Sequence, residues 1–132
     1  MIIKALSVKQ PWASLIVDGN KTIETRTWST SYRGDLLIVS SKEPDRSEMF
    51  TRMRHDDRFK PGMIFLLGQA LCIARLVDCR PMTAADMVAA CCGGSKQLWA
   101  WCLEDVRKIE PFPVKGQLRL YDVEMPEGFK QK

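Results

Sequence analysis

Glycine, proline and polar turn residues divide the sequence into short apolar segments of five to nine residues. Segments of this length are typical of strands, whereas most helices that pack against a core are longer. The Thr-rich segment Lys21–Trp28 alternates along its length and is also predicted to be extended. We predict strands over Ile2–Val8, Asp35–Ser41, Met63–Leu67, Ala70–Asp78, Leu98–Val106 and Gly116–Val123, with a break at Pro111-Phe-Pro113 before the last.

One helix is predicted near the N-terminus. Trp12, Leu15 and Ile16 recur at helical spacing and form one apolar stripe. Pro11 suits the first turn of a helix, and Gly19 is a natural stop at its C-terminal end. The sequence therefore predicts a helix over Pro11–Asp18.

Two further helices are predicted, and they do not alternate regularly with the strands. Thr83 and Asp86 have the spacing of a capping box, which opens a short helix that continues to about Cys91 before Gly93-Gly94. Asp45–Arg54 is a further helical candidate. The irregular alternation argues against a parallel α/β sheet. We predict an α+β fold, a small, closed or nearly closed β-barrel with helices over its openings.

The 132 residues are enough for one domain, and we expect a single domain over residues 1–132. The N-terminus has no secretory pattern, and the longest apolar run, Met63–Leu67, is far below a membrane span. Five cysteines without a secretory signal indicate free thiols in the cytoplasm. With one histidine, His55, and no C-x-x-C pair, no metal is predicted, and no organic cofactor is indicated.

The net charge of +4 permits a polyanionic partner without demanding one. Residues 1–66 hold 11 basic and 8 acidic side chains, so most of the surplus lies in the first half. Within Gln10–Lys42, basic side chains are interleaved with Trp12, Trp28 and Tyr32. Cations for phosphate and flat rings for base stacking are what a single-stranded nucleic-acid site needs. The alternative is that the tryptophans are core residues, which the helix stripe favours for Trp12.

Lys21, Glu24 and Arg26 form a charged cluster with two interpretations. Strand alternation puts Glu24 and Arg26 on one face, where they would form a surface ion pair, and Lys21 and Thr25 on the other. A carboxylate beside a lysine can also move protons, and a partly buried lysine can act as a base or nucleophile.

Three segments together resemble the ASCH (activating signal cointegrator homology) domain family, a branch of the PUA-like superfamily. They are L-S-V-K-Q-P-W-A at 6–13, G-N-K-T-I-E-T-R-T-W at 19–28 and Y-R-G-D-L-L-I at 32–38. Later segments agree, so the resemblance spans nearly the whole chain. It implies a PUA-like barrel of five to six strands, with two to three short helices flanking a cleft that binds RNA or a modified nucleotide.

The resemblance also implies site residues. Lys21, Glu24 and Arg26 would face the ligand, and the residues that would build or flank the pocket are Pro11, Trp12, Trp28, Arg33 and Lys42. Related domains leave open whether the ligand is RNA, DNA or a free nucleoside.

Some members of the family are enzymes, either N4-acetylcytidine amidohydrolases or ribonucleases. The amidohydrolases use a Lys and a Thr of this motif with a later Glu. Here the Lys is Lys21, but Glu24 occupies the Thr position, and the later region Thr83–Gly94 offers Asp86 and no Glu. The leading interpretation is a nucleic-acid binder. The alternatives are a hydrolase that uses Lys21 and Glu24, and a protein-interaction module.

Overall fold

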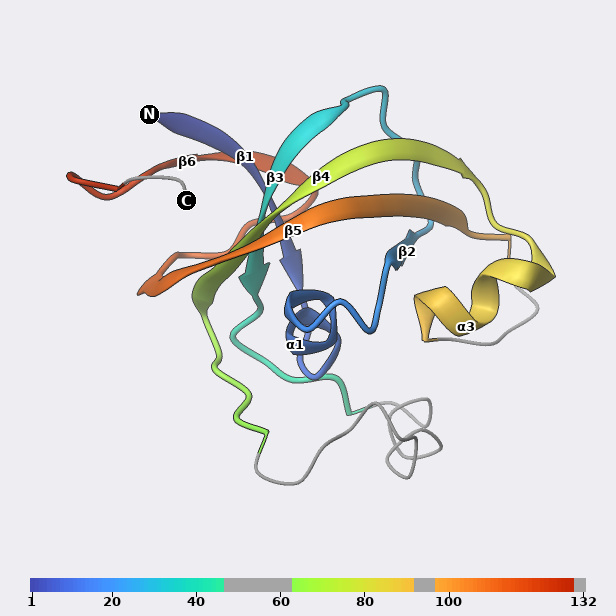
Figure 1. Ribbon diagram of the computed structural model, residues 1–132, viewed down its shortest axis with the longest axis horizontal. Coiled ribbons are helices and arrows are strands. Elements are labelled where there is room, and N and C mark those ends of the chain that lie inside the picture. The colour runs from blue at the N-terminus through green and yellow to red at the C-terminus, as the bar shows by residue number, and fades with distance from the viewer. Residues whose placement is uncertain (47–62, 92–96, 130–132) are drawn as a thin grey trace.

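A six-stranded mixed sheet curves into a half-barrel in the part of the chain that the computed structural model describes, residues 1–46, 63–91 and 97–129 (Figure 1). The strand order is β2-β5-β4-β3-β1-β6. The strands are β1 (Ile2–Val8), β2 (Ile23–Arg26), β3 (Gly34–Ser40), β4 (Gln69–Pro81), β5 (Trp99–Pro113) and β6 (Leu120–Glu124). The helices are α1 (Trp12–Val17), the 3-10 helix η1 (Ala84–Asp86) and α3 (Met87–Ala90). The predicted α+β, barrel-like fold is confirmed.

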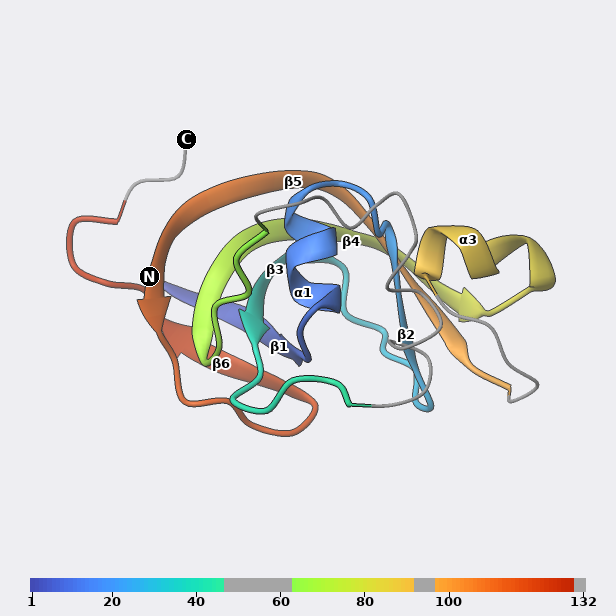
Figure 2. The ribbon, with the colours of Figure 1, turned by 90° about the horizontal axis from the view of Figure 1, so that it is seen from below.

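The curvature comes from the long central pair, β4 and β5. All neighbouring strands are antiparallel except β1 and β3. The register between β4 and β5 shifts at three places, and such bulges bend a strand and increase its twist. The sheet therefore curls, and Figure 2 shows α1 enclosed by the arc of β3, β4 and β5.

Period-two alternation along β3 separates the two larger of the three core clusters in the described residues. Leu36 and Ile38 of β3 join the cluster that contains Leu15 of α1 and Trp101 of β5. The intervening residues of β3, among them Leu37, point to the other face and join a second cluster around β6. Because both faces of the central strands are covered, these strands are apolar on both sides.

Several element predictions are confirmed. The structure places β1 over Ile2–Val8, as predicted, and α1 within Pro11–Asp18. The capping box is present, since the Thr83 backbone N–H donates to Asp86 Oδ2 at 2.8 Å. The helix candidate Asp45–Arg54 lies mostly outside the described residues, as do Gly93-Gly94 and Cys92.

Two strand predictions are wrong, and a third, Gly116–Val123, holds only from Leu120, where β6 begins. Met63–Leu67 forms no strand, and Ile64 is 78% exposed. Both edges of the following strand, β4, are already paired with β3 and β5, so this apolar run finds no partner there. Pro111-Phe-Pro113 does not separate two strands but forms the last residues of β5, where Pro113 pairs with Gln69.

The described residues contain neither a helix that could span a membrane nor a cluster of side chains that could hold a metal ion. No helix there is long and apolar enough to cross a membrane. No group of three or more His, Cys, Asp or Glu side chains there could hold a metal ion. Cys72 and Cys91 are buried within the larger core cluster, as expected for cysteines that act as small apolar residues.

Candidate functional site

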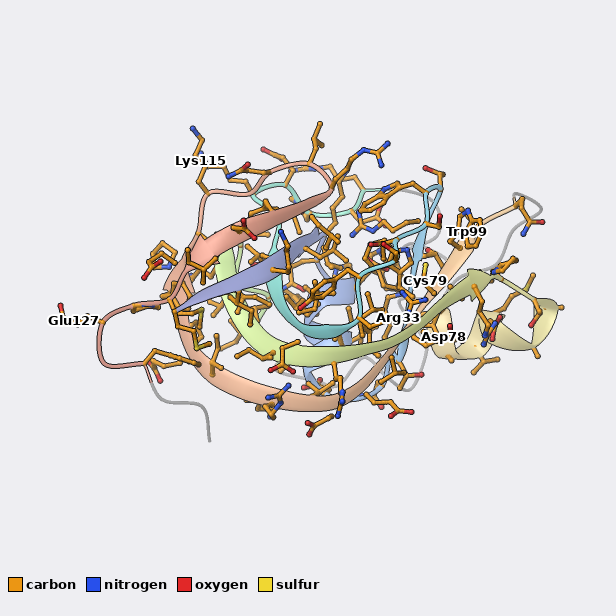
Figure 3. The ribbon with its side chains drawn as sticks, turned by 90° about the horizontal axis from the view of Figure 1, so that it is seen from above. Arg33, Asp78, Cys79, Trp99, Lys115 and Glu127 are labelled. Atoms are coloured by element: carbon orange, nitrogen blue, oxygen red, sulfur yellow. The ribbon has the colours of Figure 1, made fainter. Side chains whose placement is uncertain are left out.

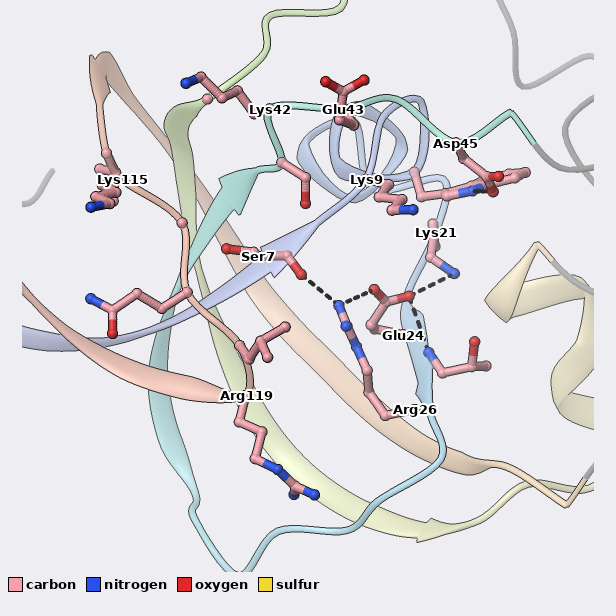
Figure 4. Close-up of a pocket in the computed structure, with 18 of the residues that line it drawn as sticks. Ser7, Lys9, Lys21, Glu24, Arg26, Lys42, Glu43, Asp45, Lys115 and Arg119 are labelled. Carbon is pink, nitrogen blue, oxygen red and sulfur yellow. Dashed lines mark hydrogen bonds and ion pairs between the residues drawn. The ribbon is translucent and has the colours of Figure 1, made fainter.

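A cleft of about 1100 Å³ lies where the curved sheet fails to close (Figure 4). β2 and the pair β1–β6 stand at opposite ends of the strand order. Arg26 of β2 reaches across this gap, and its Nη2 donates a hydrogen bond to the backbone oxygen of Ser7 in β1 at 2.7 Å. A side chain thus joins two strands that share no ladder, and the space beside it is the cleft.

Lys21, Glu24 and Arg26 form a triad in the wall of the cleft, which we call the buried triad because Lys21 and Glu24 are buried, whereas Arg26 is partly exposed. Lys21 is 3% exposed and Glu24 is 7% exposed. Glu24 Oε1 lies 3.4 Å from Lys21 Nζ, and Glu24 Oε2 accepts a hydrogen bond from Arg26 Nη2 at 2.9 Å. One carboxylate therefore holds two cations at the surface of the cleft.

Lys21 enters this triad because it precedes the strand. β2 begins only at Ile23, so the alternation that placed Lys21 opposite Glu24 does not extend to Lys21. Gly19 has a φ of +79°, a conformation that favours glycine, and it turns the chain after α1. Lys21 Nζ then donates to the Ala90 carbonyl and lies 5.9 Å from the centre of the Trp12 ring. The prediction that strand alternation separates Lys21 from Glu24 is wrong.

Glu24 is held as a carboxylate. Burial by itself would raise its pKa, but the charges of Lys21 and Arg26 and a hydrogen bond from the Thr25 backbone N–H at 3.1 Å outweigh burial. The pKa of Glu24 therefore lies below its ordinary value. At neutral pH this side chain can accept hydrogen bonds but has no proton to give.

Acid is expected to destabilise the protein in part through Glu24. The pKa of Glu24 is lower in the folded state than in the unfolded state, where it is about 4.3. Ionised Glu24 therefore stabilises the folded protein fully above this unfolded-state pKa, and the stabilisation is lost as the pH falls through the folded-state pKa. We expect the urea midpoint of the wild-type protein to fall from pH 7 to pH 3, and that of Glu24→Gln to fall less. The exposed Glu43, changed to Gln, should leave the wild-type pH profile unchanged. Parallel profiles for wild type and Glu24→Gln would contradict the assignment.

The charged side chains around the cleft are mostly basic. Among the described residues, six basic and three acidic side chains line the cleft. Asp45 accepts a hydrogen bond from Trp12 Nε1 at 2.6 Å, which fixes one wall. The basic residues are Lys9, Lys21, Arg26, Lys42, Lys115 and Arg119, and the acidic ones are Glu24, Glu43 and Asp45.

Five of the predicted site residues meet at this cleft: Trp12, Lys21, Glu24, Arg26 and Lys42. The other three are not among its lining residues. Pro11 is buried at the start of α1. Trp28 packs edge-on against Trp101, with the ring centres 4.8 Å apart, and the guanidinium of Arg119 lies 4.9 Å from the centre of the Trp28 ring.

Arg33 lies outside the cleft. Its guanidinium donates to the carbonyls of Thr30 and Tyr32 and lies 3.7 Å from Asp78. Figure 3 shows Arg33 beside Asp78 and well away from Lys115.

Sequence reasoning missed the segment between β5 and β6, residues 114–119, all of which line the cleft. Its signal was present in two basic residues, Lys115 and Arg119, on either side of Gly116. A Cβ on Gly116 would lie 3.0 Å from Ser7 Oγ, which is tighter than most Cβ contacts, so this segment lies close to β1.

Thr25 and Asp86, which the sequence comparison with the amidohydrolases singles out, lie in different parts of the structure. Thr25, which alternation assigns to the opposite face of the strand, is among the residues that line the cleft. Asp86 is not, and its carboxylate accepts hydrogen bonds from Arg80 at 2.7 and 2.8 Å. Asp86 therefore holds the helix start and the end of β4 together.

The sequence matches the ASCH domain over residues 6–113, which is most of the chain. The chain belongs to the ASCH domain family. The match includes the whole buried triad, but it ends at Pro113, just before the cleft-lining segment 114–119.

Two curated proteins share a short segment with this ASCH domain. Activating signal cointegrator 1 of Homo sapiens is 51% identical over 45 residues, and that of Mus musculus is 49% identical over the same length. The segment covers 33% of this chain and only 8% of either relative.

Crystal structures of two mutants of ZmASCH from Zymomonas mobilis have the same fold as this ASCH domain. Each superposes with a TM-score of 0.58 at 14% sequence identity. The match covers 92% of this chain in both cases and 89% and 87% of the two crystallised chains.

Proposed function

We propose that this ASCH domain binds single-stranded RNA or a modified nucleotide in its cleft. The observation that carries the proposal is the composition of that cleft, in which six basic side chains surround a space of about 1100 Å³. Ligand sites usually have volumes of about 300–1000 Å³, so the space suffices for a nucleotide. Family membership agrees with the proposal, because the PUA-like fold is used for RNA and modified bases.

The buried triad supplies groups that a base can use. Among the buried side-chain nitrogen and oxygen atoms of the described residues, Arg26 Nε alone has no hydrogen-bond partner. A buried donor without a partner costs about 1–3 kcal/mol, which a ligand carbonyl would recover. Glu24 Oε2 accepts a hydrogen bond from Arg26, and a carboxylate oxygen has a second lone pair for an exocyclic amine or sugar hydroxyl.

The experiment is a titration of a fluorescently labelled single-stranded RNA octamer with the protein at several salt concentrations. Binding through phosphate contacts predicts that the logarithm of the affinity falls linearly with the logarithm of the salt concentration. A DNA octamer of the same sequence and a duplex RNA serve as competitors. Absence of RNA binding at low salt would contradict the proposal.

A second candidate function is hydrolysis of an acylated pyrimidine nucleoside or of RNA. It is favoured by one observation, the buried ion pair of Lys21 and Glu24 in the wall of a cleft. In this role the anionic Glu24 would polarise a water molecule, and Lys21 would stabilise the developing negative charge.

The two candidates are distinguished by incubating the protein with N4-acetylcytidine and, separately, with single-stranded RNA, and following the products by chromatography. Turnover that disappears in Lys21→Ala would establish the hydrolase. Intact substrates together with salt-dependent RNA affinity would establish the binder.

We also propose that residues 1–132 act as one ASCH domain in the cytoplasm. The free thiols of Cys72, Cys79 and Cys102 support this compartment, because a reducing environment keeps cysteines unpaired.

A further inference from the structure

One end of the cleft is built from three segments far apart in the sequence, joined by backbone hydrogen bonds. Gly68 N–H donates to the carbonyl of Ser40 at 3.0 Å, and Val114 N–H donates to the carbonyl of Gly68 at 3.1 Å. Lys42 lies two residues after Ser40, and Lys115 directly follows Val114. The hydrogen bonds therefore hold two lysines at the same end of the cleft.

These lysines differ from the cations of the buried triad in their surroundings. Lys42 and Lys115 are both exposed, and within residues 1–46, 63–91 and 97–129 no carboxylate forms an ion pair with either. Lys21 and Arg26, in contrast, share the carboxylate of Glu24. This pair of exposed lysines is thus separate from the triad.

The remaining two cations of the cleft are directed elsewhere. Figure 4 shows Lys42 and Lys115 together on one side, with Lys9 on the side of Asp45. The guanidinium of Arg119 lies over the ring of Trp28, which is outside the cleft. The cleft therefore has a basic end, Lys42 and Lys115, and a hydrogen-bonding end, the buried triad.

We propose that Lys42 and Lys115 bind the phosphate of the ligand, so that a nucleotide lies with its phosphate at the basic end and its base toward Glu24 and Arg26. This proposal rests on the proposed function. Ammonium groups on flexible stems act as point charges, which suits a phosphate that stays partly hydrated. Buried, fixed donors and acceptors suit a base, whose edge presents polar groups at fixed positions.

The test is the salt dependence of RNA affinity in the double variant Lys42→Gln, Lys115→Gln. For a single-stranded RNA octamer, losing two phosphate contacts should reduce the slope of log affinity against log salt by about 1.4, and lower the affinity at low salt roughly tenfold. Lys108→Gln is the matched control, because Lys108 is exposed on β5 outside this cleft, and it should leave the slope unchanged. An unchanged thermal midpoint shows that the double variant is folded.

The outcomes separate this proposal from the proposed function. If the wild-type protein binds RNA and the double variant keeps the wild-type slope, the assignment of Lys42 and Lys115 to the phosphate is overturned, and the proposed function is not. A slope that falls as much in Lys108→Gln would also overturn it, since the effect would then be one of overall charge. Absence of RNA binding by the wild-type protein would overturn both.

Discussion

Glu24→Ala is expected to lower the free energy of unfolding by about 3–5 kcal/mol, because it leaves Lys21 buried without its carboxylate. Lys21 is 3% exposed, and without Glu24 it keeps, among the described residues, only the Ala90 carbonyl and the Trp12 ring as partners. Arg26 loses the same partner. For a chain of this size the thermal midpoint should fall by roughly 10–15 °C. Chemical and thermal unfolding followed by circular dichroism measure both quantities.

Glu43→Ala is the matched control for this prediction. Glu43 also lines the cleft, but its side chain is 76% exposed and lies 3.9 Å from the exposed Arg46. Surface ion pairs contribute little, so its removal should change the free energy of unfolding by less than about 1 kcal/mol. Similar losses for the two variants would contradict the account of a buried triad.

Arg26→Ala is expected to weaken RNA binding by roughly 10- to 100-fold. Arg26 carries the unpartnered Nε, and hydrogen bonds to charged groups contribute about 1.5–3 kcal/mol. The substitution also removes the bridge to Ser7 between β2 and β1, so circular dichroism must first show that the variant is folded. Fluorescence anisotropy with labelled single-stranded RNA then measures the affinity.

Arg33→Ala is the control for this second prediction. The resemblance to the ASCH family assigns both arginines to the site. Arg33, however, already donates to two backbone carbonyls and does not line the cleft. Its loss removes only one distant charge, which salt screens, so RNA affinity should change by less than about twofold. Equal losses for Arg26→Ala and Arg33→Ala would show that binding does not centre on the cleft.

Sequence patterns predicted the helices and strands that form because of their own residues, independently of distant partners. Ile2–Val8 was predicted within its observed bounds because alternation and flanking residues agree. Met63–Leu67 is just as apolar, yet whether such a run becomes a strand depends on a free edge nearby, and both edges of β4 are paired. The continuation of β5 through Pro113 also depends on its partner, since β4 extends alongside it from Gln69.

The site shows the same difference between features that depend on neighbouring residues and features that depend on distant ones. Glu24 and Arg26 are two residues apart on one strand, so alternation sufficed to put them on one face. Lys21 joins them through the turn after α1, a feature that strand alternation cannot describe. Lys115 is 94 positions from Lys21 in the sequence, and only the curling of the sheet brings both to one cleft.

The most direct test of the central claim is a two-dimensional NMR titration of the isotopically labelled protein with a single-stranded RNA octamer. We expect the largest shifts at the backbone amides around the cleft, those of Glu24, Arg26, Lys42 and Lys115, and small shifts at Arg33 and Lys108. Shifts that centre on the outer face of β4 and β5, or no shifts at saturating RNA, would contradict the claim that this cleft binds nucleic acid.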